Sequence, residues 1–172
     1  LFPALNKVGA KAQTEVDRAI RERFAIKSDQ VRKSFVFIRS KQKGPDVVAV
    51  LQIFGSPTRR GRSMNLIRFV EKKVTLAEGR RRAKSGTLSH LRFKILRGSG
   101  LKQIAGTFIG NQGRTVFRRT GKERLPIEPV QVIGVSQMFN TRTVRKRVEE
   151  RIERELVVEV QRAVDLVIRR RG

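Results

Sequence analysis

The last quarter of the sequence carries an apolar stripe that is too long for a compact domain of this size. Between about 137 and 169, apolar residues recur at helical spacing: Val144, Val148, Ile152, Leu156, Val160, Ala163 and Val167. We predict one C-terminal helix over 137–169, capped by Ser136. At about 1.5 Å per residue this helix is roughly 50 Å long, whereas a compact chain of this length has a radius of gyration of about 16 Å. The helix must therefore bend, project or pack against another subunit.

The second half of this predicted helix is apolar on more than one side. Beyond Leu156, apolar residues also fall outside the narrow stripe. A helix with apolar residues around much of its circumference is usually covered on more than one side. We therefore predict a subunit interface at four of these residues: Val157, Val158, Val164 and Ile168.

The rest of the chain predicts an α+β fold, in which an antiparallel β-sheet is flanked by an N-terminal helix and the long C-terminal helix, with basic loops. An amphipathic helix is expected over 3–24, and Ser28 and Asp29 offer N-cap chemistry for a short helix that runs to about Ser34. Residues 47–54, "VVAVLQIF", are apolar on both alternating faces, which predicts a central strand covered on both sides. At 172 residues, one domain over 1–172 is expected.

Two hairpins are predicted in the middle of the chain. "LSHLRFKIL" alternates between apolar and polar residues, and after the turn "RGSG" its expected partner is "LKQIAGTFIG". "RTVFRR" follows a second turn at 111–113 and continues the sheet. The segment 66–76, "LIRFVEKKVTL", fits a strand or a short helix, and the strand is favoured.

Charge limits the choice of partners. The chain has 40 Lys and Arg against 15 Asp and Glu, a net charge of +25, which attracts polyanions and repels copies of itself. Two predicted exposed loops, about 55–65 and 79–86, concentrate cations: Arg59, Arg60, Arg62, Arg80, Arg81, Arg82 and Lys84. Such residues contact phosphate without reading sequence. The equal alternative is a solvated surface or contact with an acidic protein.

The sequence offers little for catalysis. It has no Cys, and His90 is its single His, so no imidazole cluster or cysteine-based zinc site can form. The acids alternate with Arg on the terminal helices, where ion pairs are expected, and no phosphate-binding glycine loop occurs. We expect a protein that is not an enzyme and has no cofactor or metal. No apolar run approaches a membrane span.

A stretch that follows the second hairpin joins cations to an apolar run with prolines: "VFRRTGKERLPIEPVQVIGV", residues 116–135. We predict that "VFRRTG" ends a strand, that "KERLPI" leaves the sheet along an extended path, and that "VQVIGV" leads to the last helix. Phe117 and Ile127 are expected in the core. The expected exposed rim consists of Arg118, Arg119, Lys122 and Arg124.

The order of motifs in this region resembles the minor tail protein Z family of long-tailed bacteriophages and prophages. "RFKILRGSGLKQIAGTFIG" is followed by "GRTVFRRTGKERLPIEPVQVIGVSQMF". The residues that match the family motifs are Phe108, Ile109, Val116, Phe117, Arg119, Arg124, Pro126 and Ile127. The chain departs from the family where the last helix starts, because it has "IGVSQMF" in place of a Gly-Pro-Ser-Val type of sequence.

The resemblance implies a structural virion protein that completes the tail at its head-proximal end and takes part in head-to-tail joining. It implies a homo-oligomer, often a hexameric ring around the DNA path, in the tail or neck of a virion assembled in the host cytoplasm. Its implied partners are other phage tail and neck proteins, with double-stranded genome DNA as a further, sequence-independent partner. The alternative left open by the residues is a general basic nucleic-acid-binding protein of ribosomal or nucleoid type.

Overall fold

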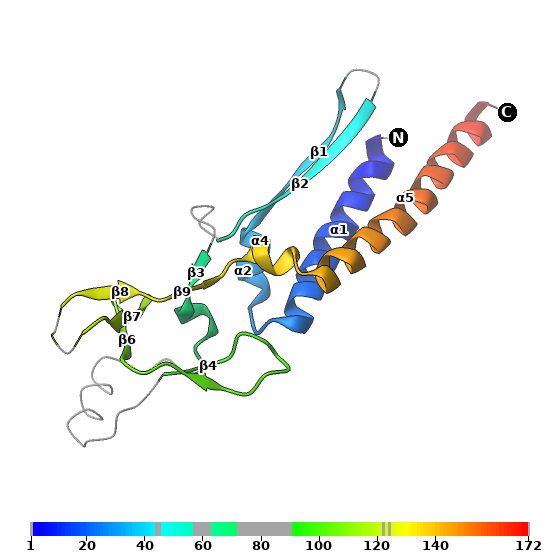
Figure 1. The fold of residues 1–172 in the computed structure, drawn as a ribbon. Helices are drawn as coiled ribbons and strands as arrows, with labels where there is room; N and C mark the ends of the chain where they lie inside the picture. The colour runs from blue at the N-terminus through cyan, green and yellow to red at the C-terminus, as the bar shows by residue number, and fades with distance from the viewer. Residues whose placement is uncertain are drawn as a thin grey trace. The chain divides into compact units, whose positions relative to one another are not determined.

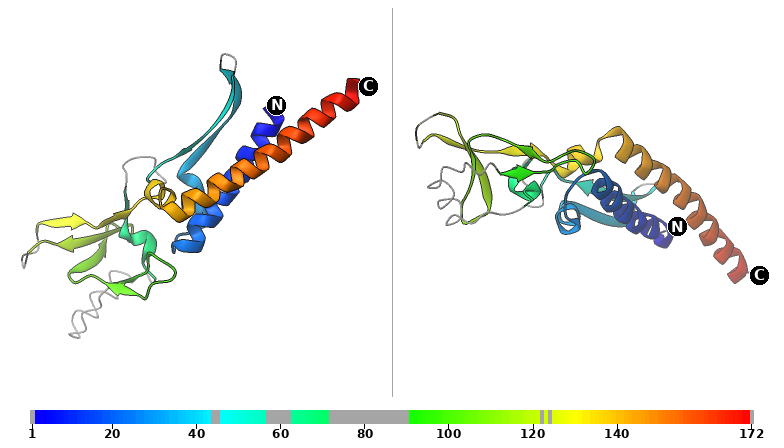
Figure 2. Two further views of the ribbon diagram at one scale, coloured as in Figure 1. Left: turned by 45° about the vertical axis from the view of Figure 1, so that its right-hand side comes forward. Right: turned by 90° about the horizontal axis from the view of Figure 1, so that it is seen from below.

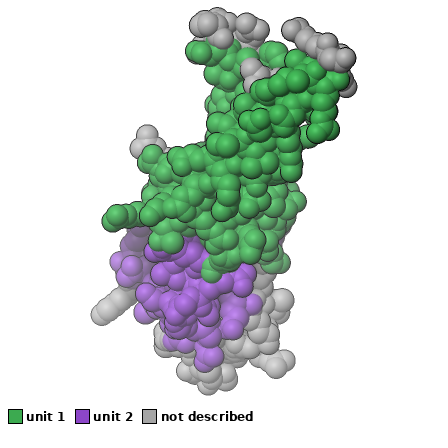
Figure 3. Space-filling model, turned by 90° about the vertical axis from the view of Figure 1, so that its right-hand side faces the viewer, with its two compact units in different colours: residues 1–22, 27–62, 134–172 green, residues 23–26, 63–133 purple. Residues whose placement is uncertain are grey.

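The computed structural model describes residues 2–43, 46–56, 63–71, 91–121, 123 and 125–171. They form the predicted α+β fold, with an N-terminal helix, small antiparallel sheets and a long C-terminal helix (Figure 1). The chain divides into two compact units, coloured separately in Figure 3. Unit 1 consists of 1–22, 27–62 and 134–172, and unit 2 of 23–26 and 63–133. The single-domain expectation stays a prediction.

Two long helices dominate unit 1. Helix α1 (Phe2–Arg23) is amphipathic and turns one apolar face into the core, through Ala4, Val8, Ala12, Val16 and Ile20. Helix α5 (Arg142–Arg171) runs antiparallel beside it, so both chain termini lie at the same end of this helix pair (Figures 1 and 2). Val144 and Val148, from the predicted stripe, are buried at 2% and 1% exposure.

The predicted C-terminal helix begins as two pieces, not one. Helix α4 (Val135–Phe139) ends at Asn140, and α5 starts only at Arg142. Gly134, not Ser136, is the N-cap of α4, and its N–H donates to Oε1 of Gln137 at 2.9 Å. The break is stabilised by the Thr141 hydroxyl, which donates to the carbonyl of Met138 at 2.8 Å. A side chain that satisfies a terminal carbonyl competes with continuing the helix, which the apolar stripe alone did not indicate.

The predicted cap at Ser28 is also wrong. Helix α2 (Ser28–Lys33) has Lys27 at its N-cap, and the Ser28 hydroxyl donates instead to Oδ2 of Asp17 at 2.9 Å. Asp17 is only 2% exposed, and Arg21 and Arg32 lie beside the same carboxylate at 3.3 and 3.5 Å. This buried acid therefore ties α2 to α1.

The predicted doubly covered strand is half of a two-stranded ribbon. Strand β2 (Asp46–Ile53) pairs with β1 (Phe35–Lys43), and among the described residues it has no other strand neighbour. The register shifts between Ile38 and Lys41, which places a bulge in β1. One face of the ribbon packs on α1, so the apolar residues of the other face are not covered by a second layer. The sequence pattern showed apolar residues on both faces of the strand, but it did not indicate which elements pack on each face.

The contact between the ribbon and α1 depends on Gly9. A methyl group at this position would lie only 2.1 Å from Cζ of Phe37 in β1. Next to this contact, the Ser40 N–H donates to Oδ1 of Asn6 at 2.8 Å, and the Ser40 hydroxyl donates to the carbonyl of Phe2 at 3.0 Å. The ring thus rests directly on the helix backbone.

Unit 2 consists of short antiparallel strands. Two of its sheets have two strands each: β3 (Ser63–Asn65) pairs with β9 (Gln131–Ile133), and β4 (Arg92–Phe93) pairs with β5 (Lys102–Gln103). The third sheet has three strands, β6 (Thr107–Gly110), β7 (Thr115–Arg119) and β8 (Ile127–Pro129). Both predicted hairpins are confirmed, although their strands are shorter than expected. The second hairpin, β6 with β7, has its turn at Asn111, Gln112 and Gly113, which all have positive φ. The favoured strand at 66–76 is wrong, because Leu66–Phe69 is a 3-10 helix, η1.

Asn65 joins three parts of unit 2. Its Oδ1 accepts from the N–H groups of Val116 at 2.8 Å and Ile67 at 3.1 Å, and its Nδ2 donates to the Val116 carbonyl at 3.1 Å. The neighbouring Met64 is 3% exposed. The end of the predicted exposed loop 55–65 is therefore a buried strand, and 57–62 lie outside the described residues, as do 72–90.

The segment after β7 does not leave the sheet as predicted. Strand β8 returns to β7, with Phe117 opposite Pro129 and Arg119 opposite Ile127. Phe117 and Ile127 are half-buried, and the core residues of this sheet are Val116 and Ile109, at 0% and 7% exposure. Alternate residues of a strand face opposite sides, so the prediction placed the wrong face of β7 inward. The final part, "VQVIGV", does lead to the last helices.

We expect Gly9→Ala to lower the free energy of unfolding. In an ordinary helix interior the change stabilises by about 1 kcal/mol, but here the Phe37 ring must move, at a cost of about 1–3 kcal/mol. Urea unfolding should therefore show a loss. In a Phe37→Leu background the same change should be neutral or stabilising; a loss of equal size in both backgrounds would contradict the contact.

Candidate functional site

The three-stranded sheet of unit 2 has an open face that combines aromatic rings with a cation. Phe108 and Phe117 are paired across β6 and β7, with ring centroids 6.0 Å apart and planes 29° from parallel. The Arg119 guanidinium lies 5.5 Å from the centre of the Phe108 ring. Such a contact contributes about 0.5–1 kcal/mol at an exposed site and holds the guanidinium in place.

Gly110 positions the Phe117 ring. A methyl group here would come within 3.0 Å of Cδ2 and Cε2 of that ring. The ring therefore leans over the bare backbone of β6, as aromatic residues do beside a strand glycine. The sheet can present Phe117, Phe108 and Arg119 as one surface because of this close approach.

The family-motif residues lie together on this sheet. Phe108 and Ile109 belong to β6, Val116, Phe117 and Arg119 to β7, and Ile127 to β8. Pro126 is exposed just before β8, and Arg124 lies outside the described residues. The motif therefore specifies one structural element, with Ile109 and Val116 on its buried face and the ring pair on its open face.

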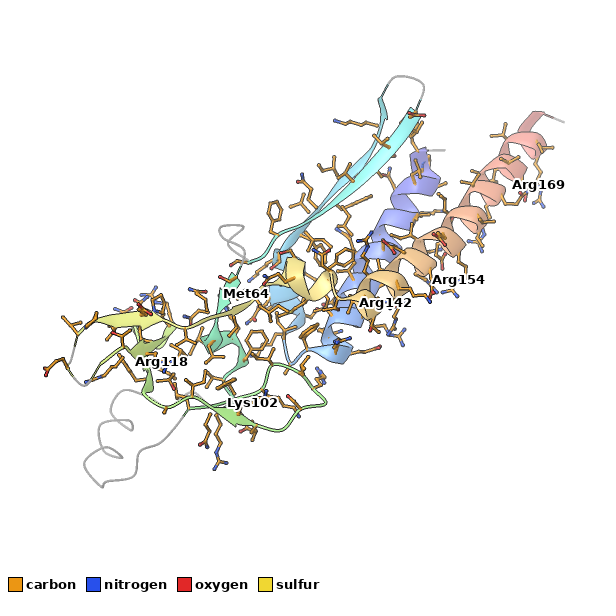
Figure 4. The ribbon with its side chains drawn as sticks, viewed as in Figure 1. Met64, Lys102, Arg118, Arg142, Arg154 and Arg169 are labelled. Atoms are coloured by element: carbon orange, nitrogen blue, oxygen red, sulfur yellow. The ribbon has the colours of Figure 1, made fainter. Side chains whose placement is uncertain are left out.

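The described cations of the predicted rim are exposed. Arg118 and Arg119 both lie at the exposed end of β7 (Figure 4 labels Arg118), and Lys122 lies outside the described residues. Arg114, at the start of the strand, donates to Oε1 of Gln112 at 2.7 Å. The cations of the predicted basic loops, Arg59, Arg60, Arg62, Arg80, Arg81, Arg82 and Lys84, also lie outside the described residues.

A ladder of ion pairs joins α1 to α5. Lys11 donates to Glu155 at 2.6 Å and to Glu159 at 2.7 Å, and Arg147 donates to Glu15 at 2.6 Å and also to Glu22. Glu159 is only 3% exposed, and its carboxylate also lies 3.6 Å from Lys7 and 3.1 Å from Arg162. The register of these pairs confirms that the two helices are antiparallel.

The ladder shifts the protonation of its members. Hydrogen bonds from Lys11 lower the pKa of Glu155 and of Glu159 below the usual value, against the effect of desolvation. Those same bonds raise the pKa of Lys11. The pKa of Glu22 is lowered by its hydrogen bond from Arg147 and then by that from Arg18. These acids are therefore used inside the protein, and the charge left for partners is mainly positive.

The far half of α5 exposes apolar residues around much of its circumference, including Leu166 at 58% and Val167 at 52%. The four predicted interface residues are all exposed: Val157 at 71%, Val158 at 40%, Val164 at 43% and Ile168 at 64%. Three of them, Val157, Val164 and Ile168, are spaced by seven and four residues and share one side of the helix, while Val158 lies about 100° away from Val157. The structure thus separates the predicted set into a stripe and a neighbour.

Among the described residues, no group of His, Asp or Glu is arranged to hold a metal ion, and His90 lies outside them. None of the described helices is both long and apolar enough to cross a bilayer. A groove lies along the ladder, lined by Lys11, Thr14, Glu15, Arg18 and Arg151 with Ala10. Its charges are largely paired within the helix pair.

The sequence analysis did not find the pairing of Phe108 with Arg119. The signal was available, because the turn at 111–113 fixes the register, and Arg119 is then diagonal to Phe108 on the same face. Asn65 is also the N-cap of η1, a local role that its residue type could have indicated, whereas its bonds to Val116 depend on the folded chain.

The comparisons with known proteins give one match. A family model described as Prophage minor tail protein Z (GPZ) matches residues 2–170. No curated protein and no solved structure matches the chain. The matched range includes both units.

The ladder predicts a loss of stability in acid. A carboxyl whose folded pKa is lowered adds stability above its unfolded pKa, 4.5, and loses it as the pH falls through the lower folded value. The urea midpoint should therefore fall once the pH drops below about 4.5. Glu159→Gln should lower the midpoint at pH 7 and make the acid decline shallower. Glu150→Gln, at an exposed pair with Lys146, is the control and should change neither.

Proposed function

Because the chain belongs to the prophage minor tail protein Z family, we propose that it completes the phage tail at its head-proximal end and takes part in joining the tail to the head. Membership makes it a phage minor tail protein with a structural role. The observation that carries the proposal is the length of the match, 2–170, which spans nearly all of the 172 residues and so includes both units.

We propose that it acts as a homo-oligomer, with a hexameric ring around the DNA path as the expected form. Support comes from the exposed apolar side of α5, since valine and isoleucine side chains exposed to 71% and 64% gain free energy when a partner covers them. Such a protein would be part of the tail or neck of a virion assembled in the host cytoplasm. Its role needs no catalysis and no cofactor.

The net charge supports polyanionic partners of more than one kind. Duplex DNA carries about one charge per 1.7 Å, so about 40 Å of threaded DNA offers only about 24 charges, whereas one copy of this chain carries +25. A ring of several copies therefore has far more positive charge than the DNA inside it. We propose that the remainder faces acidic surfaces of neighbouring tail and neck proteins, or solvent.

The second candidate, a general nucleic-acid-binding protein of ribosomal or nucleoid type, is favoured only by the same charge. Its readout differs, because it predicts tight binding of duplex DNA or RNA by single chains at physiological salt. A ring component whose charge is shared among protein neighbours should bind DNA weakly as a single chain and lose that binding as salt rises.

Mass spectrometry of purified virions and isolated tails tests the proposed role. We expect the chain in both, and deletion of its gene should yield filled heads and separate tails that electron microscopy shows to be unjoined. Re-expression should restore joining. Absence of the chain from virions and from tails, or normal joining without it, would contradict the proposal.

Arg118 and Arg119 are expected to supply part of the contact with DNA. The double variant Arg118→Gln/Arg119→Gln should reduce the slope of log K against log salt by about 1.8, or 0.9 for each phosphate contact. The matched control is Arg142→Gln/Arg154→Gln, which removes the same charge from exposed positions on α5 (Figure 4). Filter binding over a salt series measures both. Equal slope changes would mean that only total charge matters.

A further inference from the structure

Unit 1 has a second uncovered apolar surface, on the ribbon. Side chains alternate across β1 and β2, so the apolar residues facing away from α1 are Val36, Ile38, Val48 and Val50, which we name the ribbon face. Gln52, opposite Val36, and Lys41, opposite Val48, lie at its two ends. Ile38 and Val50 are directly opposite each other and are 39% and 40% exposed. Four β-branched side chains on a surface with no covering layer among the described residues indicate a missing partner.

The other uncovered surface is the α5 stripe, which we define as Val157, Val164 and Ile168. Lys11 pairs with Glu155 and Glu159, so those two acids mark the side of α5 that meets α1. The α5 stripe lies about 140–180° around the helix from Glu159. It therefore faces away from α1.

The two surfaces point in roughly opposite directions. Helix α1 meets the ribbon through Phe2, Asn6 and Gly9 and meets α5 through Lys7, Lys11 and Glu15. At 100° per residue these sets lie on opposing sides of α1. In Figure 1 α1 runs between the ribbon and α5. A single chain therefore cannot cover one surface with the other.

We propose that the α5 stripe of one copy packs on the ribbon face of a second copy of this chain. This contact rests on the proposed homo-oligomer and names the surfaces that build it. A twofold pairing of α5 with α5 would cover both stripes and leave both ribbon faces bare. A head-to-tail contact covers both kinds of surface in every copy, and repeated rotation closes it into a ring.

The dimensions of the two surfaces agree. From Val157 to Ile168 the stripe rises eleven residues, about 16 Å. On the ribbon, Val36 to Lys41 spans five residues, about 16 Å, and Val48 to Gln52 four, about 13 Å. A helix laid along a two-stranded ribbon of equal length buries one apolar row against the other without leaving an end exposed.

Local charge favours a second copy in spite of the net charge of +25. Glu153 is exposed on the same side of α5 as the stripe and precedes it by about one turn, and Glu150, paired with Lys146, precedes it by about two turns. At the far end of the ribbon face, Lys41 is exposed opposite Val48. Placing acids against cations sets the orientation, with Val157 near Val48 and Ile168 near Val36.

Cysteine cross-linking tests the contact directly, because the chain has no Cys of its own. The purified variant Val50→Cys/Val164→Cys is oxidised mildly at concentrations where sedimentation shows an oligomer, then run on a non-reducing gel. We expect a ladder of covalent multimers, because each copy has one cysteine for each neighbour. A disulfide forms only where two Cβ atoms come within about 3.5–4.5 Å, so Val48→Cys/Val157→Cys and Val36→Cys/Ile168→Cys are tested in parallel to allow for register.

Matched variants separate this contact from others. Val50→Cys/Val158→Cys moves one cysteine off the stripe to an exposed valine about 120° around α5 from Val164. This control variant should give no covalent multimers. Val164→Cys alone should give no dimer; a rapid dimer would show α5 pairing with α5 and overturn the proposal. Equal ladders from the test and control variants would overturn it as well.

Charge exchange tests the orientation. Glu153→Lys and Lys41→Glu should each weaken self-association several-fold, as for an exposed ion pair, and the double variant should recover most of that loss. Thermal unfolding of each variant checks that it is folded. Additive losses in the double variant would overturn the proposed orientation.

The outcomes separate this contact from the proposed function. If the chain forms an oligomer but none of the three cysteine pairs gives covalent multimers, the contact is overturned and the tail role is unaffected. A chain that sediments as a monomer at every concentration overturns both the contact and the ring, and its presence or absence in virions still decides the tail role.

Discussion

Unit 1 depends on a single helix that is packed on both sides. At Gly9, α1 offers bare backbone to the Phe37 ring, and across the helix Lys11 holds Glu155 and Glu159 of α5. The first contact requires the absence of a side chain, and the second requires a long charged one. Because the two lie on opposite sides of α1, the ribbon and α5 are separated by the width of a helix. Each keeps its outer surface free, and this separation creates two uncovered apolar surfaces in one unit.

The distribution of acids explains how a chain with so few of them projects such a strong positive charge. Carboxylates of Glu15, Glu22, Glu155 and Glu159 are engaged by cations across the α1–α5 junction, and Asp17 is buried against Ser28 and Arg32. These acids neutralise their partners locally and hold the helices in register. Arg118 and Arg119 face solvent at the end of β7, and the residue opposite Arg118 is the exposed Glu128 of β8. Among the described residues, neither arginine has an ion pair like those of the ladder. The paired charges at the α1–α5 junction therefore stabilise the fold, and the exposed cations remain available to attract partners.

Periodicity and turn chemistry predicted those elements whose packing is local. The first helix was expected over 3–24 and is found at Phe2–Arg23, and the turn at 111–113 gave the pairing of β6 with β7. Features that depend on distant partners were missed. Asn65 caps η1 locally, but its bonds to Val116 join residues that are far apart in the sequence. At the break after α4, the Thr141 hydroxyl binds the Met138 carbonyl and so competes with continuation of the helix. The choice between Val116 and Phe117 as the buried residue depended on which face of the sheet meets the rest of unit 2, which alternation alone does not specify.

The two places where the sequence is more apolar than the single chain requires are β2 and the far half of α5. In both, the pattern specified coverage on two sides, and the fold supplies one. Val50 and Ile38 remain exposed at 40% and 39%, and Val157 and Ile168 at 71% and 64%. An isolated exposed valine has no meaning, but two apolar rows of similar length, each next to a row that is only half-buried, indicate that both surfaces lack a partner in the single chain. Under the proposed homo-oligomer such excess apolarity would have a physical use, since covering these surfaces would favour assembly, while the net positive charge would oppose contacts that bury little apolar surface.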